Sequence, residues 1–440
     1  MSGGNGPASI RVRMYNAGFG DAFLLFIPVS DANRPTRKVL IDCGTHTPIP
    51  GLPSMDTIVK RIIADASVGE ANGAARIDIV VATHRHLDHV CGFEHPDWAT
   101  VSVGEVWMPW TENPKEPEAR RVWGVQSAAI AGLIRALERR TRLAGAAGRE
   151  ARAFLAMMKS NLPNAAAMKT LYDGFAGSPK RVYLPAKPKS NETADEAGAR
   201  LSFDVPLLGN VVAHVLGPTW DKKIFSMSVR KSEEYLRAAG AAVDAHDAAS
   251  AGAPPPFRAR WSLGAGAFGR KYPDLAFPRE ARARLAHFDE VSDLEAAADV
   301  HRAVNNSSLM LLFEVNRTAR LLFPGDSEWR TWRNVLKDQT WQPLLRGLTF
   351  YKVGHHGSRN ANPKTFVEQY LGKDVPDPWV MIPTHRLDDQ PTWDIPREPL
   401  VKALRKRTTR LARADRLGSA PTPAFRPHGD LYVDAIIPIA

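Results

Sequence analysis

A short apolar segment, Ile77 to Ala82, ends directly at a cluster of histidines and an aspartate. The segment has the length and character of a buried strand. The six residues that begin at His84 and end at His89 contain four potential metal ligands. Imidazole and carboxylate groups are ligands of Zn, Fe and Mn, and a rigid strand can fix the directions of side chains at its end. The segment therefore predicts a metal site at the end of a buried strand.

The spacing within this cluster predicts two neighbouring metal positions. His84 and His86 are two residues apart, so in extended backbone their side chains point towards one centre. Asp88 and His89 lie on the turn that follows and can reach a second centre. Unrelated polar residues on a surface rarely cluster so tightly. We therefore expect two divalent metal ions, Zn or Mn, held by these side chains.

Two later segments also place possible ligands after apolar strands. An apolar run ends at Asp326, whose two carboxylate oxygens can bridge two cations. Another strand ends at the pair His355 and His356, which glycines flank on both sides. Glycines allow a ligand or a phosphate to approach the backbone closely. Together with the first cluster, these segments predict one composite site.

The neighbours of the histidine pair have two possible roles. Ser358 and the backbone of Gly357 could contact a phosphate group, but a serine after glycine is also typical of a plain turn. Lys352 has the same two interpretations.

Strands and helices alternate in two halves of the chain. Strands are predicted over 10–15, 22–29, 38–42, 77–82, 201–205, 210–216, 308–315, 319–323, 348–353 and 379–382, and helices over 55–66, 329–336, 363–371 and 400–411. Each half proceeds from strands to helices. This order favours two sheets packed face to face and covered by helices on both sides, which is a four-layered αββα sandwich of the α/β class.

Two segments interrupt this pattern. Residues 111–199 are rich in Ala, Arg and Glu with apolar residues at helical spacing, and we interpret them as a helical insertion. The main domain would then comprise 1–110 and 200–440. Within it, residues 238–277 are rich in Pro, Gly and Ala and predict a long loop. Arginines of the insertion could form a basic face, although a solvated outer face is the simpler interpretation.

Composition limits the partners and the compartment. The 440 residues include 58 Lys and Arg against 47 Asp and Glu, a formal net charge of +11, which favours polyanionic partners such as nucleic acid. Cys43 and Cys91 are too few for a disulfide framework. The first residues lack the pattern of a secretory signal, and no apolar stretch is long enough for a membrane span. We expect a cytoplasmic protein without a membrane partner; the sequence leaves the oligomeric state open.

The order of the motifs resembles that of metallo-β-lactamase-fold hydrolases, and within them of soluble relatives of the hydrolase domain of ComEC DNA-uptake proteins. The resemblance covers roughly 10–110 and 200–440. It rests on Gly18-Phe19-Gly20-Asp21, Ile41-Asp42-Cys43-Gly44, the run from His84 to His89, Asn305-Asn306-Ser307-Ser308-Leu309, Gly325-Asp326 and His355-His356-Gly357-Ser358.

The resemblance implies a role for each site residue. His84 and His86 would bind the first metal, Asp88 and His89 the second, Asp326 would bridge them, and His355 would complete the second site. Asp42 would orient the histidine loop from outside the ligand set, as metal-binding histidines generally require. Asp88, His356 and Ser358 are the predicted catalytic residues.

One position departs from the family pattern. Many members place a third histidine for the first metal on the strand before the bridging aspartate, where this chain has Asn305 to Ser308. Asn306 is a candidate for the missing ligand, and His214 and His301 are others.

Three functions are compatible with this site. Two neighbouring cations lower the pKa of a water molecule between them and neutralise charge on an attacked group, so the expected chemistry is hydrolysis through a metal-bridged hydroxide. The first hypothesis is a phosphodiesterase or nuclease acting on DNA or another phosphodiester, with basic residues of 402–416 contacting phosphates and Trp98, Trp107, Trp110 or Trp329 stacking on bases. The alternative substrate is a small ester, lactone, lactam or thioester. The third is a non-catalytic binding protein with a degenerate site.

Overall fold

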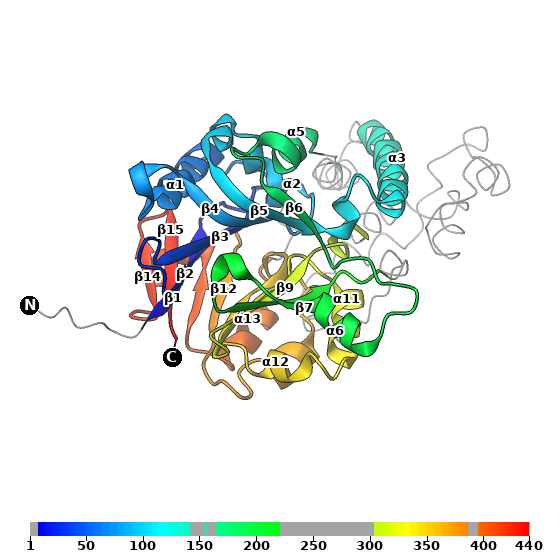
Figure 1. Cartoon of the computed structure of the whole chain (residues 1–440). Helices are drawn as coiled ribbons and strands as arrows, with labels where there is room; N and C mark the ends of the chain where they lie inside the picture. Colours follow the sequence, from blue (N-terminus) through cyan, green and yellow to red (C-terminus); the bar gives the residue numbers. More distant parts are fainter. Residues whose placement is uncertain (1–7, 141–154, 156–163, 221–302, 386–394, 440) are drawn as a thin grey trace, which may run out of the picture.

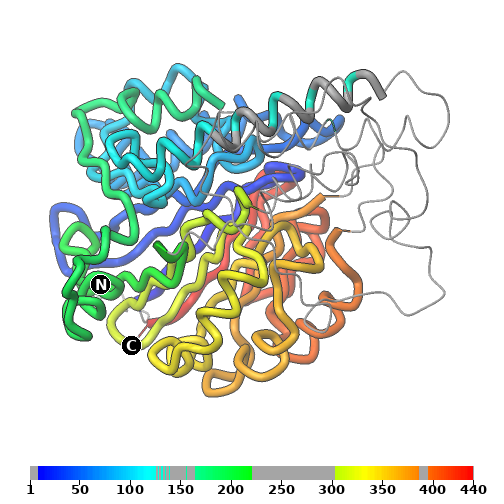
Figure 2. Tube along the Cα trace, turned by 90° about the vertical axis from the view of Figure 1, so that its right-hand side faces the viewer, coloured from blue at the N-terminus to red at the C-terminus, as the bar shows by residue number. Residues whose placement is uncertain are grey.

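The computed structural model describes residues 8–140, 155, 164–220, 303–385 and 395–439. Within these residues, two β-sheets stack face to face and helices cover the outer face of each sheet (Figure 1). Figure 2 shows the elements of residues 8–184 on one side of the stack and those of residues 303–413 on the other. The predicted αββα sandwich is therefore confirmed.

The first sheet contains the first and the last described strands. Its order is β14-β15-β1-β2-β3-β4-β5-β6. The bounds are β1 Ser9–Tyr15, β2 Ala22–Pro28, β3 Thr36–Cys43, β4 Arg76–Val81, β5 Ser102–Pro109, β6 Lys180–Leu184, β14 Phe425–His428 and β15 Tyr432–Pro438. Strands β3 to β6 are parallel, whereas β15 pairs antiparallel with β1 and places Ser9 opposite Pro438. The two ends of the described chain therefore lie side by side.

The second sheet presents the carboxyl ends of four neighbouring strands at one edge. Its order is β13-β12-β11-β10-β9-β8-β7. The bounds are β7 Ser202–Asp204, β8 Val211–Gly217, β9 Met310–Val315, β10 Ala319–Phe323, β11 Phe350–Lys352, β12 Trp379–Ile382 and β13 Leu411–Arg413. Strands β10 to β13 are parallel. Loops that follow these strands therefore emerge together, in the order of the strands.

The helices are α1 Met55–Ser67, α2 Leu87–Val90, α3 Pro117–Arg140, α5 Ala165–Lys169, α6 Ala194–Leu201, α11 Trp329–Lys337, α12 Gln342–Arg346 and α13 Glu398–Arg405. Apolar faces of α1 and α5 pack on the outer side of the first sheet, and those of α11, α12 and α13 on the outer side of the second. In α1, Ile58 and Ile62 lie one turn apart and are buried against the first sheet. The hydroxyl of Ser54 caps this helix by accepting a hydrogen bond from the Thr57 amide at 3.1 Å.

The core between the sheets is apolar and includes tryptophan. The Trp107 ring stacks against Phe313 of the facing sheet, with 6.2 Å between ring centroids. Trp98 and Trp110 are also buried. These three rings therefore form part of the packed interior and are not available to stack on bases, the role that the nuclease hypothesis offered them. Trp329 is only partly buried.

Two of the expected boundaries differ from the structure. Residues 111–199, predicted as a helical insertion, include β6, which pairs with β5 in the first sheet. The helix predicted over 400–411 ends at Arg405, and Leu411 begins β13. Leu411 matches the helical spacing of Leu400 and Leu404, but pairing with Val380 of β12 places it in the sheet. The predicted loop over 238–277 lies outside the described residues.

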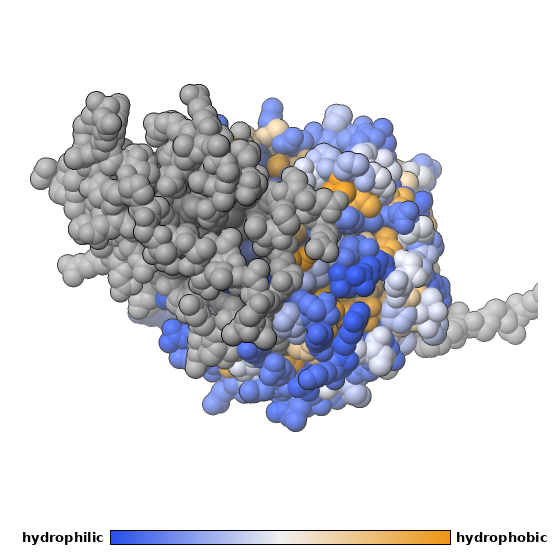
Figure 3. All heavy atoms as spheres, turned by 180° about the vertical axis from the view of Figure 1, so that it is seen from behind, coloured by the Kyte–Doolittle hydropathy of each residue, from blue (hydrophilic) through white to orange (hydrophobic). Residues whose placement is uncertain are grey.

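The visible described surface is mostly hydrophilic. Figure 3 shows hydrophilic side chains with small, separate hydrophobic patches on the face opposite to that of Figure 1. Val68 is a large apolar side chain that is strongly exposed. Among the described helices, none has both the length and the apolar character needed to cross a membrane.

A buried ion-pair network joins segments of the first sheet and α1 that are distant in the sequence. The Arg13 guanidinium donates to both carboxylate oxygens of Asp434 at 2.7 and 2.8 Å, and to Asp65 of α1 at 2.6 Å. It also lies 3.5 Å from the centroid of the Tyr432 ring. The arginine thus links β1, β15 and α1 through three charged side chains that are all buried.

Replacing Arg13 by alanine is expected to lower the free energy of unfolding by about 3–5 kcal/mol, because the buried Asp434 loses its two-bond partner and Asp65 keeps only the partly exposed Arg61. Urea denaturation followed by circular dichroism measures this change. Lys60→Ala is the control, since its pair with Asp56 is more than half exposed and such pairs contribute little to stability. Equal effects of the two substitutions would contradict this account of the network.

Candidate metal centre

Loops from both sheets meet at one edge of the sandwich. The histidine loop follows β4 of the first sheet, whereas Asp326 follows β10 and the histidine pair follows β11 of the second sheet. The amide of Leu309, at the start of β9, donates to the Thr83 carbonyl at 2.8 Å. This bond couples the histidine loop directly to the facing sheet.

Four buried side chains from three loops converge at this edge. One potential ligand atom from each of Asp88, His89, Asp326 and His356 lies within 4.8 Å of the others. His356 Nε2 is 3.0 Å from Asp88 Oδ2, and His89 Nε2 is 3.2 Å from Asp326 Oδ2. Two carboxylates and two imidazoles at such distances can share a divalent cation.

His84 and His86 lie beside this group. His84 Nε2 is 2.9 Å from His86 Nδ1, and the His84 ring centroid is 4.1 Å from that of His89. Both residues are buried. The histidine loop thus brings three imidazole rings together on the side that faces Asp326.

The carboxylate of Asp42 anchors the histidine loop through hydrogen bonds. This carboxylate accepts hydrogen bonds from the Thr83 amide at 2.7 Å, from the Thr83 hydroxyl at 2.7 Å and from His89 Nδ1 at 2.8 Å. The backbone of Asp42 has a φ of +57°, a left-handed conformation that is uncommon for a residue with a side chain. Such strain persists at functional sites where the surrounding contacts fix it.

These contacts determine where the histidine lone pairs point. The hydroxyl of Thr83 donates to Asp42, so it accepts from His84 Nδ1, which lies 3.1 Å away. Asp42 accepts from His89 Nδ1, and the Pro383 carbonyl accepts from His356 Nδ1 at 2.9 Å. With a hydrogen on Nδ1, each neutral ring presents the lone pair of Nε2. His84, His89 and His356 therefore present Nε2, the atom that faces the other ligands.

Close backbone contacts around Gly44 require the absence of a side chain. A Cβ at Gly44 would lie 2.5 Å from the His89 amide nitrogen and from the Leu87 carbonyl. A Cβ at Gly20 would lie 2.2 Å from the Gly44 carbonyl oxygen. Gly20 and Gly44, the glycines of the two N-terminal motifs, thus let their two backbone segments pack directly behind the histidine loop.

Asp326 is positioned by Ser308 and Gly325. The Ser308 hydroxyl accepts a hydrogen bond from the Asp326 amide at 3.1 Å. Gly325 has a φ of +56°, and a Cβ there would lie 2.9 Å from the Cβ of Ser308. Ser308 belongs to the segment 305–308, which departs from the family pattern. This segment therefore orients Asp326.

The histidine pair occupies a strained turn. His355 and His356 have φ angles of +47° and +53°. This turn directs His356 into the buried cluster, whereas His355 lies at its rim with Nε2 3.9 Å from Asp326 Oδ2. The amide of His355 also donates to Asp326 at 3.1 Å. Ser358 is beside the cluster, but its hydroxyl donates to Asn360 at 2.8 Å.

The candidates for a third ligand of the first metal differ in position. Asn306 is buried, and its side-chain oxygen lies 3.4 Å from the Thr331 hydroxyl of α11. His214 is on β8, where Nδ1 lies 2.9 Å from the Ser202 hydroxyl and the ring packs against Trp341. None of these partners belongs to the histidine cluster. His301 lies outside the described residues.

Asp21 and Lys352 are two further buried charged residues beside the cluster. The Lys352 ammonium forms an ion pair with Asp21 and lies 3.8 Å from Asp326 Oδ1. Asp21 also lies 3.6 Å from His89 Nδ1. The sequence contained a signal for this residue, since Asp21 ends a glycine-rich motif, but its partner could not be read from the motif alone.

Buried charges shift the pKa values in this cluster. Burial opposes the ionised form of Asp88, but His89 and His356 outweigh it and hold the pKa of this carboxyl well below its usual range. Burial would also lower the pKa of Lys352, but Asp21 and Asp326 raise it. Burial and the neighbouring His89 hold the pKa of His84 well below its usual value. Asp88 is thus available as an anionic ligand and His84 as a neutral one.

Divalent cations fit this arrangement. The buried carboxylates of Asp21, Asp42, Asp88 and Asp326 outnumber the cationic groups that face them, which are Lys352 and the imidazoles of His89 and His356, whose pKa values these carboxylates raise. Such a group needs additional positive charge, because uncompensated buried anions are strongly unfavourable. In addition, His89 Nε2 is buried and has the Asp326 carboxylate, 3.2 Å away, as its near neighbour. A metal ion held by Asp88, His89, Asp326 and His356 would supply this charge.

Arg85 faces away from its histidine neighbours. Its guanidinium forms an ion pair with Glu112 and lies 3.6 Å from the ring centroid of Trp123 in α3. Its carbonyl accepts a hydrogen bond from the Asn164 side chain at 2.6 Å. Arg85, between His84 and His86, thus attaches the histidine loop to the helical segment after β5.

Comparison with known families agrees with this geometry. Residues 19–143 match the model of the metallo-beta-lactamase superfamily, and this range contains Asp42 and the histidine loop. This part of the chain is thus similar to that superfamily, and the buried His/Asp cluster behind it has the ligand types of a metal-dependent hydrolase. No curated protein matches the chain.

Asp42→Asn is expected to weaken Zn²⁺ affinity about 10- to 100-fold, because the amide is a poorer acceptor for His89 and Thr83. Competition with a chromophoric chelator measures the affinity. Asp31→Asn is the control, since Asp31 pairs with Arg37 at the surface, away from the cluster. Unchanged affinity in Asp42→Asn would show that the histidine loop does not need this carboxylate.

His356→Ala is expected to reduce the number of bound metal ions per chain more than His355→Ala does, because only His356 reaches into the buried cluster. Elemental analysis of the purified variants gives the two metal contents. A larger loss in His355→Ala would reverse the assignment.

Proposed function

We propose that this protein is a metal-dependent phosphodiesterase that cleaves nucleic acid. The observation that carries the proposal is the formal net charge of +11 on a chain whose buried cluster has the ligands of a metallohydrolase. Phosphate neutralisation by Lys and Arg provides sequence-independent affinity for nucleic acid. The resemblance of the glycine-rich and His-His-Gly-Ser motifs to ComEC-like hydrolases supports the same substrate class.

The metal ions supply Lewis acidity, which lowers the pKa of a water molecule and stabilises charge on the attacked phosphoryl group. The protein side chains hold and orient these components. Asp88 is ionised and lies against His356, so it can accept a hydrogen bond from the attacking water and orient it. Asp42, outside the ligand set, fixes the orientation of His89. No serine or cysteine nucleophile is needed for this reaction.

The direct test is incubation of the protein with end-labelled single- and double-stranded DNA in the presence of Mn²⁺, Zn²⁺ or Mg²⁺. Wild-type protein is expected to cleave DNA with at least one cation, and cleavage is expected to weaken as the salt concentration rises. Asp326→Ala is expected to lose at least about 100-fold in rate, because it removes an anionic group from the centre of the cluster.

Three other results would redirect the assignment. Hydrolysis of a small ester, lactone, lactam or thioester by wild type, without cleavage of DNA or RNA, would replace the nucleic-acid substrate by a small one. Equal DNA cleavage by wild type and Asp326→Ala would indicate a contaminating nuclease. Metal binding without any turnover would support a binding protein.

A further inference from the structure

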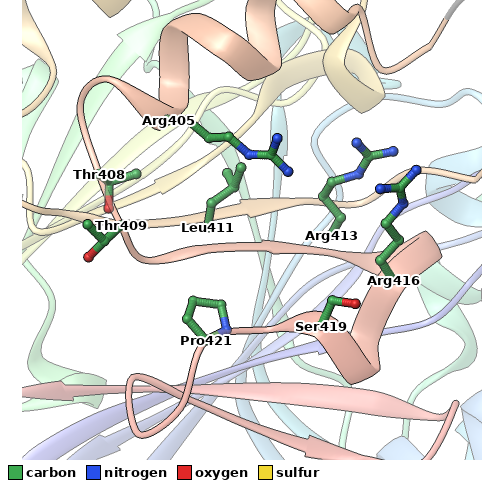
Figure 4. Close-up of a pocket in the computed structure, with 8 residues that line it drawn as sticks. All are labelled: Arg405, Thr408, Thr409, Leu411, Arg413, Arg416, Ser419 and Pro421. Atoms are coloured by element: carbon green, nitrogen blue, oxygen red, sulfur yellow. The ribbon is translucent and has the colours of Figure 1, made fainter.

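A pocket on the outer side of the second sheet is lined by three arginines. The pocket has a volume of about 450 Å³ and lies over β13, which is an edge strand of that sheet. Arg405 comes from the end of α13, Arg413 from the end of β13 and Arg416 from the turn that follows. Figure 4 shows the Arg405 side chain extending towards Arg413 and Arg416.

This arginine pocket has more positive charge than its acidic neighbours compensate. Arg413 forms a two-bond ion pair with Asp415, at 2.9 and 2.7 Å. Among the described residues, no carboxylate pairs with Arg405 or Arg416, and both are exposed. Guanidinium groups around one pocket repel each other unless an anion lies between them. The pocket is therefore suited to bind an anion.

The hydroxyl groups at the other end of the pocket have partners within the protein. Thr408 donates to the Pro378 carbonyl at 2.5 Å, and Thr409 lies 3.0 Å from each carboxylate oxygen of Asp377. Ser419 is the remaining hydroxyl and is exposed. An anion would consequently bind at the arginine end, where guanidinium groups favour the planar, two-bond recognition of phosphate.

The strand register places that end close to the metal centre. Arg413 lies opposite Ile382 of β12, and the next residue, Pro383, accepts the hydrogen bond from His356. Strands β11 and β13 are separated by two strand spacings, about 10 Å. Successive phosphates of a stacked nucleic-acid strand rise about 3.4 Å each, so this separation corresponds to about three nucleotides. One stacked strand could therefore contact both places.

We propose that the arginine pocket binds a backbone phosphate of a stacked single-stranded substrate, about three nucleotides from the phosphate at the metal centre. The inference rests on the proposed phosphodiesterase function. It differs from general attraction to a basic surface, because Lys402 and Lys406 lie on the same stretch of chain as Arg405 but do not line the pocket. Those lysines supply a control with the same change of charge.

The test compares Arg405→Gln/Arg416→Gln with Lys402→Gln/Lys406→Gln in the full chain. Fluorescence anisotropy measures the binding of labelled oligothymidylates of two and eight nucleotides without added metal. The arginine variant is expected to bind the eight-nucleotide strand at least about tenfold more weakly and to lose about 0.7 from the salt slope per lost phosphate contact. The lysine variant is expected to change this affinity less than about threefold. Both variants should bind the dinucleotide as wild type does.

Three results would overturn the proposal. Equal weakening in the two variants would mean that the charge acts diffusely. Equal weakening for both strand lengths would mean that the pocket binds a free phosphorylated ligand and not a chain. Absence of wild-type binding to the longer strand would exclude the subsite.

A separate measurement distinguishes this proposal from the proposed function. Hydrolysis of bis(p-nitrophenyl) phosphate by the wild-type protein with Mn²⁺ reports on the metal centre alone, because this ester has no second phosphate to reach the arginine pocket. If wild type hydrolyses neither this ester nor DNA, yet binds the longer strand through the two arginines, the phosphodiesterase function fails while the binding pocket stands.

Discussion

The carboxylate of Asp42 holds the histidine loop in place, and the geometry of the metal centre depends on these contacts. It accepts from Thr83 and from His89, and Thr83 in turn orients His84. One carboxylate outside the ligand set therefore fixes which nitrogen of two imidazoles faces the metal position. A group that fixes ring orientation in this way increases the basicity of the ligand as well as its precision. The left-handed backbone of Asp42 is a strained conformation of the kind that is retained at functional sites.

The site is assembled across the interface of two sheets, so its rigidity is that of the whole sandwich. Thr83 and Leu309 are joined by a backbone hydrogen bond between the sheets, while Ser308 fixes the amide of Asp326. Glycines at positions 44 and 325 let these segments approach within distances that no side chain would allow. Preorganisation of this kind matters for catalysis, because ligands held by regular strands keep their geometry better than ligands on long loops.

Charge of opposite sign is separated along one edge of the second sheet. Buried carboxylates surround the metal position at the ends of β10 and β11, whereas arginines gather at β13, two strands further on. The first group attracts cations and the second attracts anions. A polyanionic substrate that lies along this edge would meet the metal ions at one point and guanidinium groups at another. This arrangement connects the excess of basic residues in the chain to the position of its metal centre.

The sequence by itself determined the αββα class and the strand end that carries the histidine loop, because both are encoded by neighbouring residues. Periodicity sets each strand, and the ligands from His84 to His89 are contiguous. Only the tertiary structure decided which member of the later histidine pair enters the cluster, since His356 meets Asp88 across 268 positions of sequence and through a turn with positive φ angles. The pairing of Lys352 with Asp21 and the end of α13 before Leu411 were equally beyond local patterns. Each depends on contacts between segments that are distant in the chain, and spacing along the sequence contains no measure of those contacts.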